Sequence, residues 1–230
     1  MHFVKSLVII GSTLSVGSVA ALSSALEPYI GLDYYQANMK PRHDWNYIFP
    51  KTAPGATLYL GAKFHDNFAL EAGYDWSTKR GRSWVLPAGT SFFGHTVTTT
   101  ISGTVNLRRS GAHVDLVASL PAIECFELIG SIGYGWVQPK ITFKAFSLAP
   151  GVNPNTSALA SVTGKGKGVG RVSLGGLYMV TELFGVRAKV NWEGTSVIRL
   201  HGNALFDSLG YSSKAFRITT SFSGGVFCKF

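Results

Sequence analysis

Hydrophobic and polar residues alternate with a period of two over eight segments of this chain. Between Phe68 and Trp76, for example, apolar residues hold every even position, and Glu71 and Asp75 stand among the odd ones. Successive side chains of a β-strand point to opposite faces, so each segment predicts a strand with one apolar face. The predicted strands are Tyr29–Met39, Ala56–Phe64, Phe68–Trp76, Asn106–Leu120, Glu127–Val137, Val169–Val180, Phe184–Trp192 and Phe216–Phe230.

The connections between these strands alternate in length. The short ones are His65–Asn67, Pro121–Phe126 and Thr181–Leu183, and the long ones are Lys40–Gly55, Ser77–Val105, Gln138–Gly168 and Glu193–Ala215. Short turns on one rim and long loops on the other are typical of transmembrane β-barrels, whose turns face the periplasm. An even strand number places both termini on the short-turn side. The predicted fold class is thus all-β, an eight-stranded antiparallel up-and-down barrel.

The first residues predict a cleaved signal peptide. Lys5 precedes an apolar run from Leu7 to Leu22, and small residues follow it. We expect cleavage after Ala25, with Ala21 as the alternative site, so that residues 1–25 form the signal peptide and residues 26–230 the barrel domain. A membrane anchor is the other interpretation, but the run contains glycine and serine and is shorter than the roughly 20 apolar residues that a spanning helix needs.

Beyond Leu22, membrane residence has to come from strands. The chain is 46% hydrophobic and has 27 glycines, 15 Phe, 9 Tyr and 5 Trp, yet it has no second helix-length apolar run. Backbone groups in lipid must be satisfied internally, so a spanning sheet has to close on itself. Cys125 and Cys228 do not make a disulfide framework. A soluble lipocalin-like barrel, with its apolar side chains inside, is the structural alternative.

The last strand ends on an aromatic residue, with Phe222, Val226 and Phe230 on its apolar face. The hairpin Ala56–Trp76, the strand Phe126–Trp136 and terminal Phe230 together resemble the OmpA-like transmembrane domain and its relatives in the OmpX and opacity-protein groups. The resemblance implies a Gram-negative outer-membrane protein with periplasmic termini. It also implies that the barrel-assembly machinery recognises Phe222, Val226 and Phe230.

Charged residues fall on the polar, inward faces of the predicted strands. They are Asp33, Lys63, Glu71, Asp75, Asp115, Arg171, Arg187, Lys189 and Arg217. An eight-stranded barrel is only just wide enough for its own side chains, so we expect a packed ionic network rather than a wide pore. Glu71 or Asp115 would pair with Arg187 or Arg217. A narrow, gated conductance stays open as an alternative function.

The long loops carry most of the positive charge. For this count the loops are taken generously, as Lys40–Pro54, Ser77–Arg109, Gln138–Gly168 and Glu193–Lys214. They then contain three acids, Asp44, Glu193 and Asp207, and fourteen basic residues: Lys40, Arg42, Lys51, Lys79, Arg80, Arg82, Arg108, Arg109, Lys140, Lys144, Lys165, Lys167, Arg199 and Lys214. The loops therefore sum to +11 within a total of +9. This distribution favours contact with the phosphates of lipopolysaccharide, or with anionic host polysaccharides. We expect no nucleic-acid partner, and a solvated loop surface without any partner is the alternative.

Motifs with a chemical function are weak. The run Gly164–Gly170 lacks the spacing of a phosphate-binding loop, and the six histidines show no metal-ligand spacing. His113 and Asp115 share the inward face of one strand and predict a structural pair. We therefore expect no catalytic residue, cofactor or metal, and a structural and surface-interaction role. An enzyme that modifies lipopolysaccharide is a third alternative, although His201–Ala204, which faintly resembles a lipid A deacylase stretch, lacks the serine nucleophile.

Overall fold

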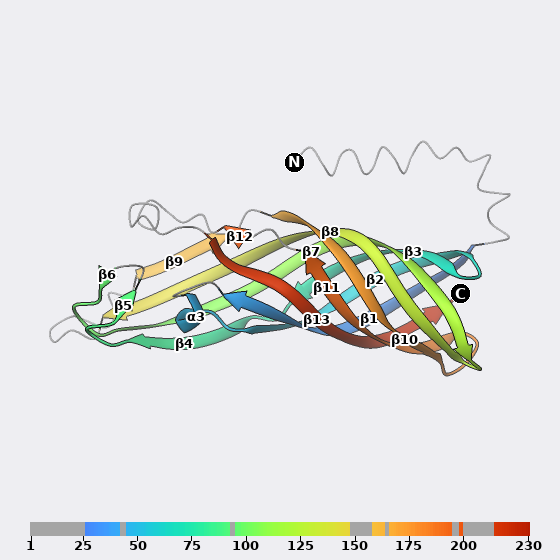
Figure 1. The fold of residues 1–230 in the computed structure, drawn as a ribbon, viewed down its shortest axis with the longest axis horizontal. Coiled ribbons are helices and arrows are strands. Elements are labelled where there is room, and N and C mark those ends of the chain that lie inside the picture. Colours follow the sequence, from blue (N-terminus) through green and yellow to red (C-terminus); the bar gives the residue numbers. More distant parts are fainter. Residues whose placement is uncertain are drawn as a thin grey trace.

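Eight long strands form the body of the molecule (Figure 1). The computed structural model describes residues 26–41, 45–92, 95–147, 158–163, 166–194, 198–199 and 214–230. The long strands are β1 (Glu27–Pro41), β2 (Thr52–His65), β3 (Phe68–Ser77), β7 (Ile101–Ile123), β8 (Phe126–Ser147), β10 (Lys167–Met179), β11 (Phe184–Gly194) and β13 (Lys214–Lys229).

These strands close into a barrel. In the order β1, β2, β3, β7, β8, β10, β11 and β13, each pairs antiparallel with the next, and β13 returns to β1 from Tyr29↔Lys229 to Pro41↔Phe216. Closure leaves no strand edge in the wall, which is the condition for crossing a bilayer with a sheet. The predicted eight-stranded up-and-down barrel is confirmed.

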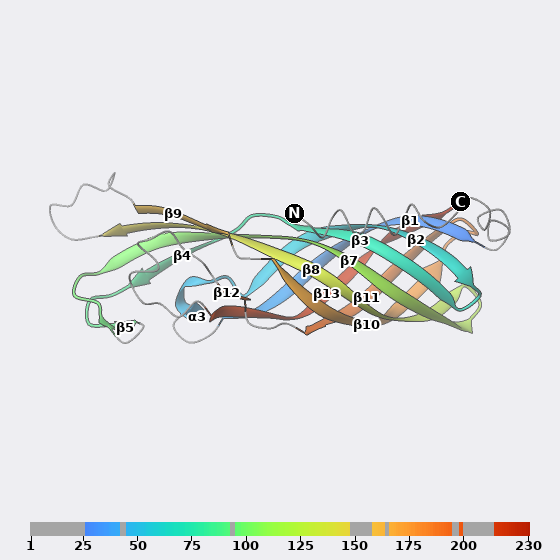
Figure 2. The ribbon, with the colours of Figure 1, turned by 90° about the horizontal axis from the view of Figure 1, so that it is seen from above.

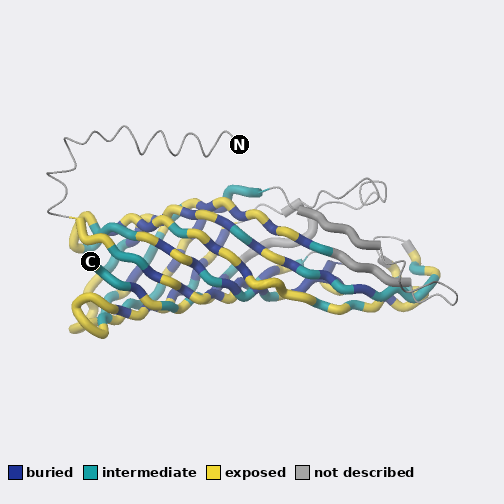
Figure 3. The backbone as a smooth tube through the Cα atoms, turned by 180° about the vertical axis from the view of Figure 1, so that it is seen from behind, coloured by how far each residue is buried: buried dark blue, intermediate teal, exposed yellow. Residues whose placement is uncertain are grey.

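Exposure alternates along most of the described wall (Figure 3). On β3, Leu70 and Tyr74 are exposed, whereas Glu71 and Asp75 are buried. The outward faces of the other strands likewise carry large apolar side chains, among them Leu32, Leu60, Ile132, Tyr134, Trp136, Val172, Leu174 and Phe222. Apolar outside and charged inside is the reverse of a soluble barrel, so the lipocalin-like alternative is wrong.

The two rims of the barrel differ. One has short turns, Asp66–Asn67, Glu124–Cys125 and Val180–Leu183, and the C-terminus lies at this end (Figure 1). At the other end, β7 and β8 run on beyond the neighbouring strands (Figure 2). There β4 (Arg80–Leu86) pairs with β7 and β9 (Ala158–Thr163) pairs with β8. We call this four-stranded extension, β4-β7-β8-β9, the projecting sheet.

Smaller elements accompany the loop-side end. A hairpin of β5 (Ser91–Phe92) and β6 (His95–Thr96) forms a separate two-stranded sheet, and β12 (Ile198–Arg199) pairs with β13. No helix in the described ranges has the length and apolar character needed to cross a bilayer.

The projecting sheet corrects two predicted strand ends. The strand expected at Asn106–Leu120 begins at Ile101, and the strand expected at Glu127–Val137 continues to Ser147. Pairing between β7 and β8 keeps one register from Ile101↔Ser147 to Pro121↔Glu127. Parts of two predicted loops are therefore strand, because a ladder can continue beyond the membrane wherever both partners remain extended.

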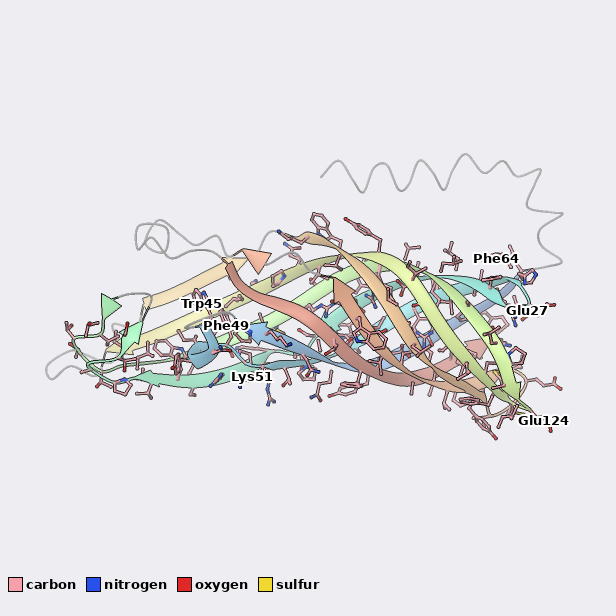
Figure 4. All side chains as sticks on the ribbon, in the orientation of Figure 1. Glu27, Trp45, Phe49, Lys51, Phe64 and Glu124 are labelled. Atoms are coloured by element: carbon pink, nitrogen blue, oxygen red, sulfur yellow. The ribbon has the colours of Figure 1, made fainter. Side chains whose placement is uncertain are left out.

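A buried apolar cluster lies inside the loop-side end of the barrel. It gathers residues from the wall and from a one-turn helix, α3 (Trp45–Ile48): Met39, Trp45, Ile48, Phe49, Ala53, Val105, Leu107, Val137, Ile141 and Val169. The amide of Phe49 donates to the carbonyl of Trp45 at 2.8 Å and closes the helical turn. Figure 4 shows Trp45 and Phe49 far from Glu27, Phe64 and Glu124, which mark the short-turn end.

Candidate functional site

The centre of the lumen is organised around Arg187 on β11. Its Nε and Nη2 donate to Asp33 on β1 at 3.0 and 2.8 Å, and its Nη1 donates to Glu71 on β3 at 2.6 Å. The guanidinium carbon lies 3.5 Å from the centroid of the Tyr59 ring. Tyr29 donates its hydroxyl to the same Glu71 oxygen at 3.0 Å. One cation therefore pairs with two buried carboxylates and lies over an aromatic face.

A second group of charges lies nearer the loop side. Arg109 Nη2 donates to both carboxylate oxygens of Glu193, at 2.6 and 2.8 Å. Arg171 Nη1 donates to Asp75 Oδ2 at 3.0 Å, and His113 Nδ1 lies 3.3 Å from that same oxygen. All of these side chains are buried, so the charged partners replace the water molecules that would hydrate the groups in solution.

Glycines in the wall let charges meet across an intervening strand. Gly225 on β13 stands in register with both Asp33 and Arg187, and a Cβ built on Gly225 would meet Asp33. Gly133 on β8 stands likewise between Asp115 and Arg171. Any side chain at these two positions would occupy the space that the ion pairs use.

The lumen is nearly balanced in charge and nearly full. Its buried charged residues, among those that the structure describes, are four cations (Arg109, Arg171, Arg187, Lys189) and five carboxylates (Asp33, Glu71, Asp75, Asp115, Glu193), with His113 beside them. The void between Asp33, Asp75, Arg109, Arg171, Arg187, Lys189 and Glu193 is about 10 Å³, and a void of about 50 Å³ lies beside Glu71 and Arg187 towards the short-turn end. A single water needs about 10 Å³, so no continuous water column passes the first group of side chains.

Of the nine charges predicted to face inward, the structure brings seven together, and Lys63 is half-buried outside the described ion pairs. Glu71 pairs with Arg187, and the cation near Asp115 is Arg171, whose Nε lies 3.8 Å from its Oδ1. Lys189 Nζ lies 4.0 Å from Asp33 and 3.8 Å from Glu71. The backbone of Arg217 pairs with Lys40, but its side chain is outside the described ones. His113 Nε2 lies 3.8 Å from Asp115, and the histidine is shared with Asp75.

Two members of the network were predicted to be loop residues. Arg109 lies on β7 and Glu193 on β11, and both are buried. Arg109 lies inside the predicted strand Asn106–Leu120, and Glu193 directly follows the predicted strand Phe184–Trp192. Both were counted with the loops because the loop bounds were drawn generously into the strand ends. The spacing did indicate an inward position for Arg109. In a strand, every second residue lies on the same face, and Arg109 lies an even number of residues from His113 and Asp115.

The other predicted basic loop residues occupy different environments. Arg80 and Arg82 lie on β4, and Arg108 lies exposed on β7, so none of the three is in a loop. Lys167 begins β10 and is half-buried, whereas Lys165 falls outside the described residues. Arg82 Nη1 donates to the carbonyl oxygens of Asn46 and Phe49, at 2.9 and 2.7 Å. It therefore holds α3 and the apolar cluster against the projecting sheet.

The predicted terminal signal faces outward. Phe222, Val226 and Phe230 are 57%, 42% and 71% exposed. In the described part of the chain, no group of histidine, cysteine, aspartate and glutamate side chains has an arrangement that could hold a metal ion.

Exposed charges separate between the two ends of the molecule. All exposed Lys and Arg side chains of the described residues lie towards the loop-side end: Lys40, Lys51, Lys79, Arg80, Arg108 and Lys140. The exposed acidic side chains of the same residues lie at the short-turn end: Glu27, Asp66, Glu124 and Glu182. Figure 4 labels Lys51 on one side of this division and Glu27 and Glu124 on the other.

Comparison with known proteins agrees with this architecture. The family model described as outer membrane protein beta-barrel domain matches residues 9–191. The solved structure of outer membrane protein OprG from Pseudomonas aeruginosa matches with a TM-score of 0.54 and 12% identity, over 90% of this chain and 96% of that one. The attachment invasion locus protein Ail of Yersinia pestis, solved with the heparin analogue sucrose octasulfate, matches with a TM-score of 0.48 and 15% identity, over 89% and 99%. A search among curated proteins gave no match.

Proposed function

Because this chain belongs to the outer membrane protein β-barrel domain family, we propose that it is a non-enzymatic surface-interaction protein that binds anionic glycans and lipopolysaccharide through its basic loop-side end. The outer membrane is where barrels of this family reside. We place the short turns in the periplasm and the projecting sheet outside the cell. Host polysaccharides and lipopolysaccharide both fall within the proposed ligand class, because both present fixed negative charge.

The separation of exposed charge carries the proposal. Six exposed cations and no exposed carboxylate lie at the loop-side end of the described residues, and the acids are at the opposite end. The fixed charges nearest to the outside of a Gram-negative cell are anionic. With the basic end facing outward, its exposed cations therefore lie next to these anions. A lumen filled by ion pairs and an apolar cluster supports a role on the surface rather than through the wall.

The proposal predicts binding that depends on salt and on these cations. The refolded protein should retain lipopolysaccharide and a sulfated polysaccharide at low salt and release both as salt rises, because exposed charges are screened over about 8 Å at 0.15 M ionic strength. The variant K51E/R80E should bind both more weakly, as measured by surface plasmon resonance across a salt series.

The matched control changes charge at the other end. E124Q/E182Q alters two exposed acids of the short turns and should leave binding unchanged. Equal binding by wild type and K51E/R80E, or binding that does not respond to salt, would contradict the proposal.

A further inference from the structure

The outer wall has a notch beside β7, at the point where the pairing of β7 changes from β3 to β4. The β3 ladder ends at Trp76↔Ser110, and the β4 ladder begins at Arg80↔Leu107. Between the two described ladders, Arg108 and Arg109 have no partner strand on this side. Ser77 Oγ accepts the Arg109 amide at 2.6 Å. This arrangement leaves an open hollow of about 440 Å³ on the outside of the barrel.

Three uncompensated cations line this notch. Lys79, Arg108 and Lys140 are exposed, and Arg108 stands directly opposite Lys140 in the β7–β8 register. Like charges opposite each other on a sheet face are destabilising unless an anion lies between them. The complete lining contains no carboxylate: Trp76, Ser77, Thr78, Lys79, Arg108, Arg109, Ser110, Gln138 and Lys140. No ion pair found among the described residues includes Lys79, Arg108 or Lys140.

The notch lies just above a band of exposed aromatic residues. Tyr74, Trp76, Tyr134 and Trp136 project outward from β3 and β8. Such aromatic bands mark the level of the lipid headgroups. Arg108 is two residues beyond Ser110, which pairs with Trp76, and two residues of strand span about 7 Å. The notch therefore opens sideways, towards the headgroups of the surrounding leaflet.

We propose that this notch binds the phosphate group of a phosphorylated glycolipid in the outer leaflet. The inference rests on the proposed function, since it assigns one member of that ligand class to a defined place. Arg108 presents a planar fork that matches phosphate oxygens, and Lys79 and Lys140 add charge from either side. Trp76 gives the sugar ring an apolar face, and Gln138 and Ser110 supply further hydrogen-bonding groups. The lipid phosphate neutralises the Arg108–Lys140 repulsion.

The test compares two triple variants. K79Q/R108Q/K140Q removes the cations of the notch, and K40Q/K51Q/R80Q removes three exposed cations elsewhere at the same end. Each protein is refolded into phosphatidylcholine vesicles that contain graded amounts of lipid A or its dephosphorylated form, and the lipid bound per barrel is measured by native mass spectrometry. Heat-modifiable migration on a gel establishes that each variant is folded.

Wild type should prefer lipid A over the dephosphorylated lipid by roughly 100-fold, the effect expected of three cations near a membrane surface. The control variant loses cations of the proposed surface but keeps the notch, so it should bind less lipid overall and retain most of this preference. The notch variant should show no preference. An equal preference in the notch and control variants would overturn the proposal. Inorganic phosphate at the concentration of the lipid should not displace lipid A, and complete displacement would reduce the notch to a general anion site.

A sulfated polysaccharide in solution separates the two proposals. The notch variant should keep part of its polysaccharide binding while it loses the preference for lipid A. One outcome would separate them. If neither wild type nor any variant binds the polysaccharide, but the notch variant alone loses the preference for lipid A, the proposed glycan binding is wrong and the assignment of lipid phosphate to the notch stands.

Discussion

Among the described cations of the lumen, Arg187 donates the most hydrogen bonds to carboxylates. It holds Asp33 and Glu71 at hydrogen-bonding distance and lies over Tyr59. Without this cation, two carboxylates would remain buried with only Lys189 near them, at 3.8 to 4.0 Å. A network of this kind is therefore most sensitive to the loss of one partner.

The variant R187M should lower the free energy of unfolding by about 3–5 kcal/mol, because it leaves both carboxylates buried and uncompensated. Urea titration in lipid vesicles, followed by heat-modifiable migration, would measure the loss. The quadruple variant D33N/E71Q/R187M/K189M also removes Lys189, which would otherwise lose both of its carboxylates. It should recover a large part of the loss. An R187M protein as stable as wild type would show that the three side chains do not depend on one another.

The neighbours Arg108 and Arg109 show what could be predicted at this scale. The period of two places Arg109 on the face of His113 and Asp115, and Arg108 on the face of Val114. Seven of the nine predicted inward charges do meet, because the membrane-spanning pattern is clean around them. Arg109 lies inside the predicted strand Asn106–Leu120 and was nevertheless counted with the loop, because a strand end outside the lipid leaves no apolar signature in the sequence.

Among the elements, α3 depends on a contact that crosses from one loop to another. Arg82 on β4 donates to two carbonyl oxygens at the α3 turn. A four-residue helix has too few internal hydrogen bonds to be stable alone, so tertiary contacts determine it. This is why the sequence predicts the eight wall strands but neither α3 nor β4 nor β9.

The variant R82A should loosen α3 without unfolding the barrel. Losing a charged donor to two carbonyls should speed amide exchange of the segment from Trp45 to Phe49 by roughly tenfold. Hydrogen–deuterium exchange with mass spectrometry would detect this change. R80A is the matched control, since Arg80 lies exposed two residues away on the same face of β4. Equal exchange in the two variants would mean that Arg82 does not hold the turn.

At the scale of the whole molecule, two closures lie in series along the barrel axis. At the level of Asp75, Arg109 and Arg187, the ionic network leaves a void of about 10 Å³. Towards the loop side, the apolar cluster adds a layer in which Phe49, Leu107 and Ile141 are almost fully buried. The two closures differ in chemistry, so no single change of conditions weakens both.

The refolded protein should therefore give no stable conductance steps in a planar bilayer. F49A should also remain at the baseline, because the ionic network below the apolar cluster still blocks the lumen. R187M combined with F49A is the first variant in which we expect ion current. Regular porin-like steps in the wild type would contradict both closures and favour the gated-porin alternative.

The β7–β8 pairing extends side-chain directions that are set in the membrane into a region outside the lipid. Lipid requires Leu116 and Ile132, which pair with each other, to face outward. The ladder then continues to Ile101↔Ser147 without a change of phase. The described side chains of the β7 and β8 extensions therefore take their direction from the bilayer. A one-residue slip of β7 relative to the lipid would reverse its surface at the loop-side end, exchanging Arg108 for Arg109.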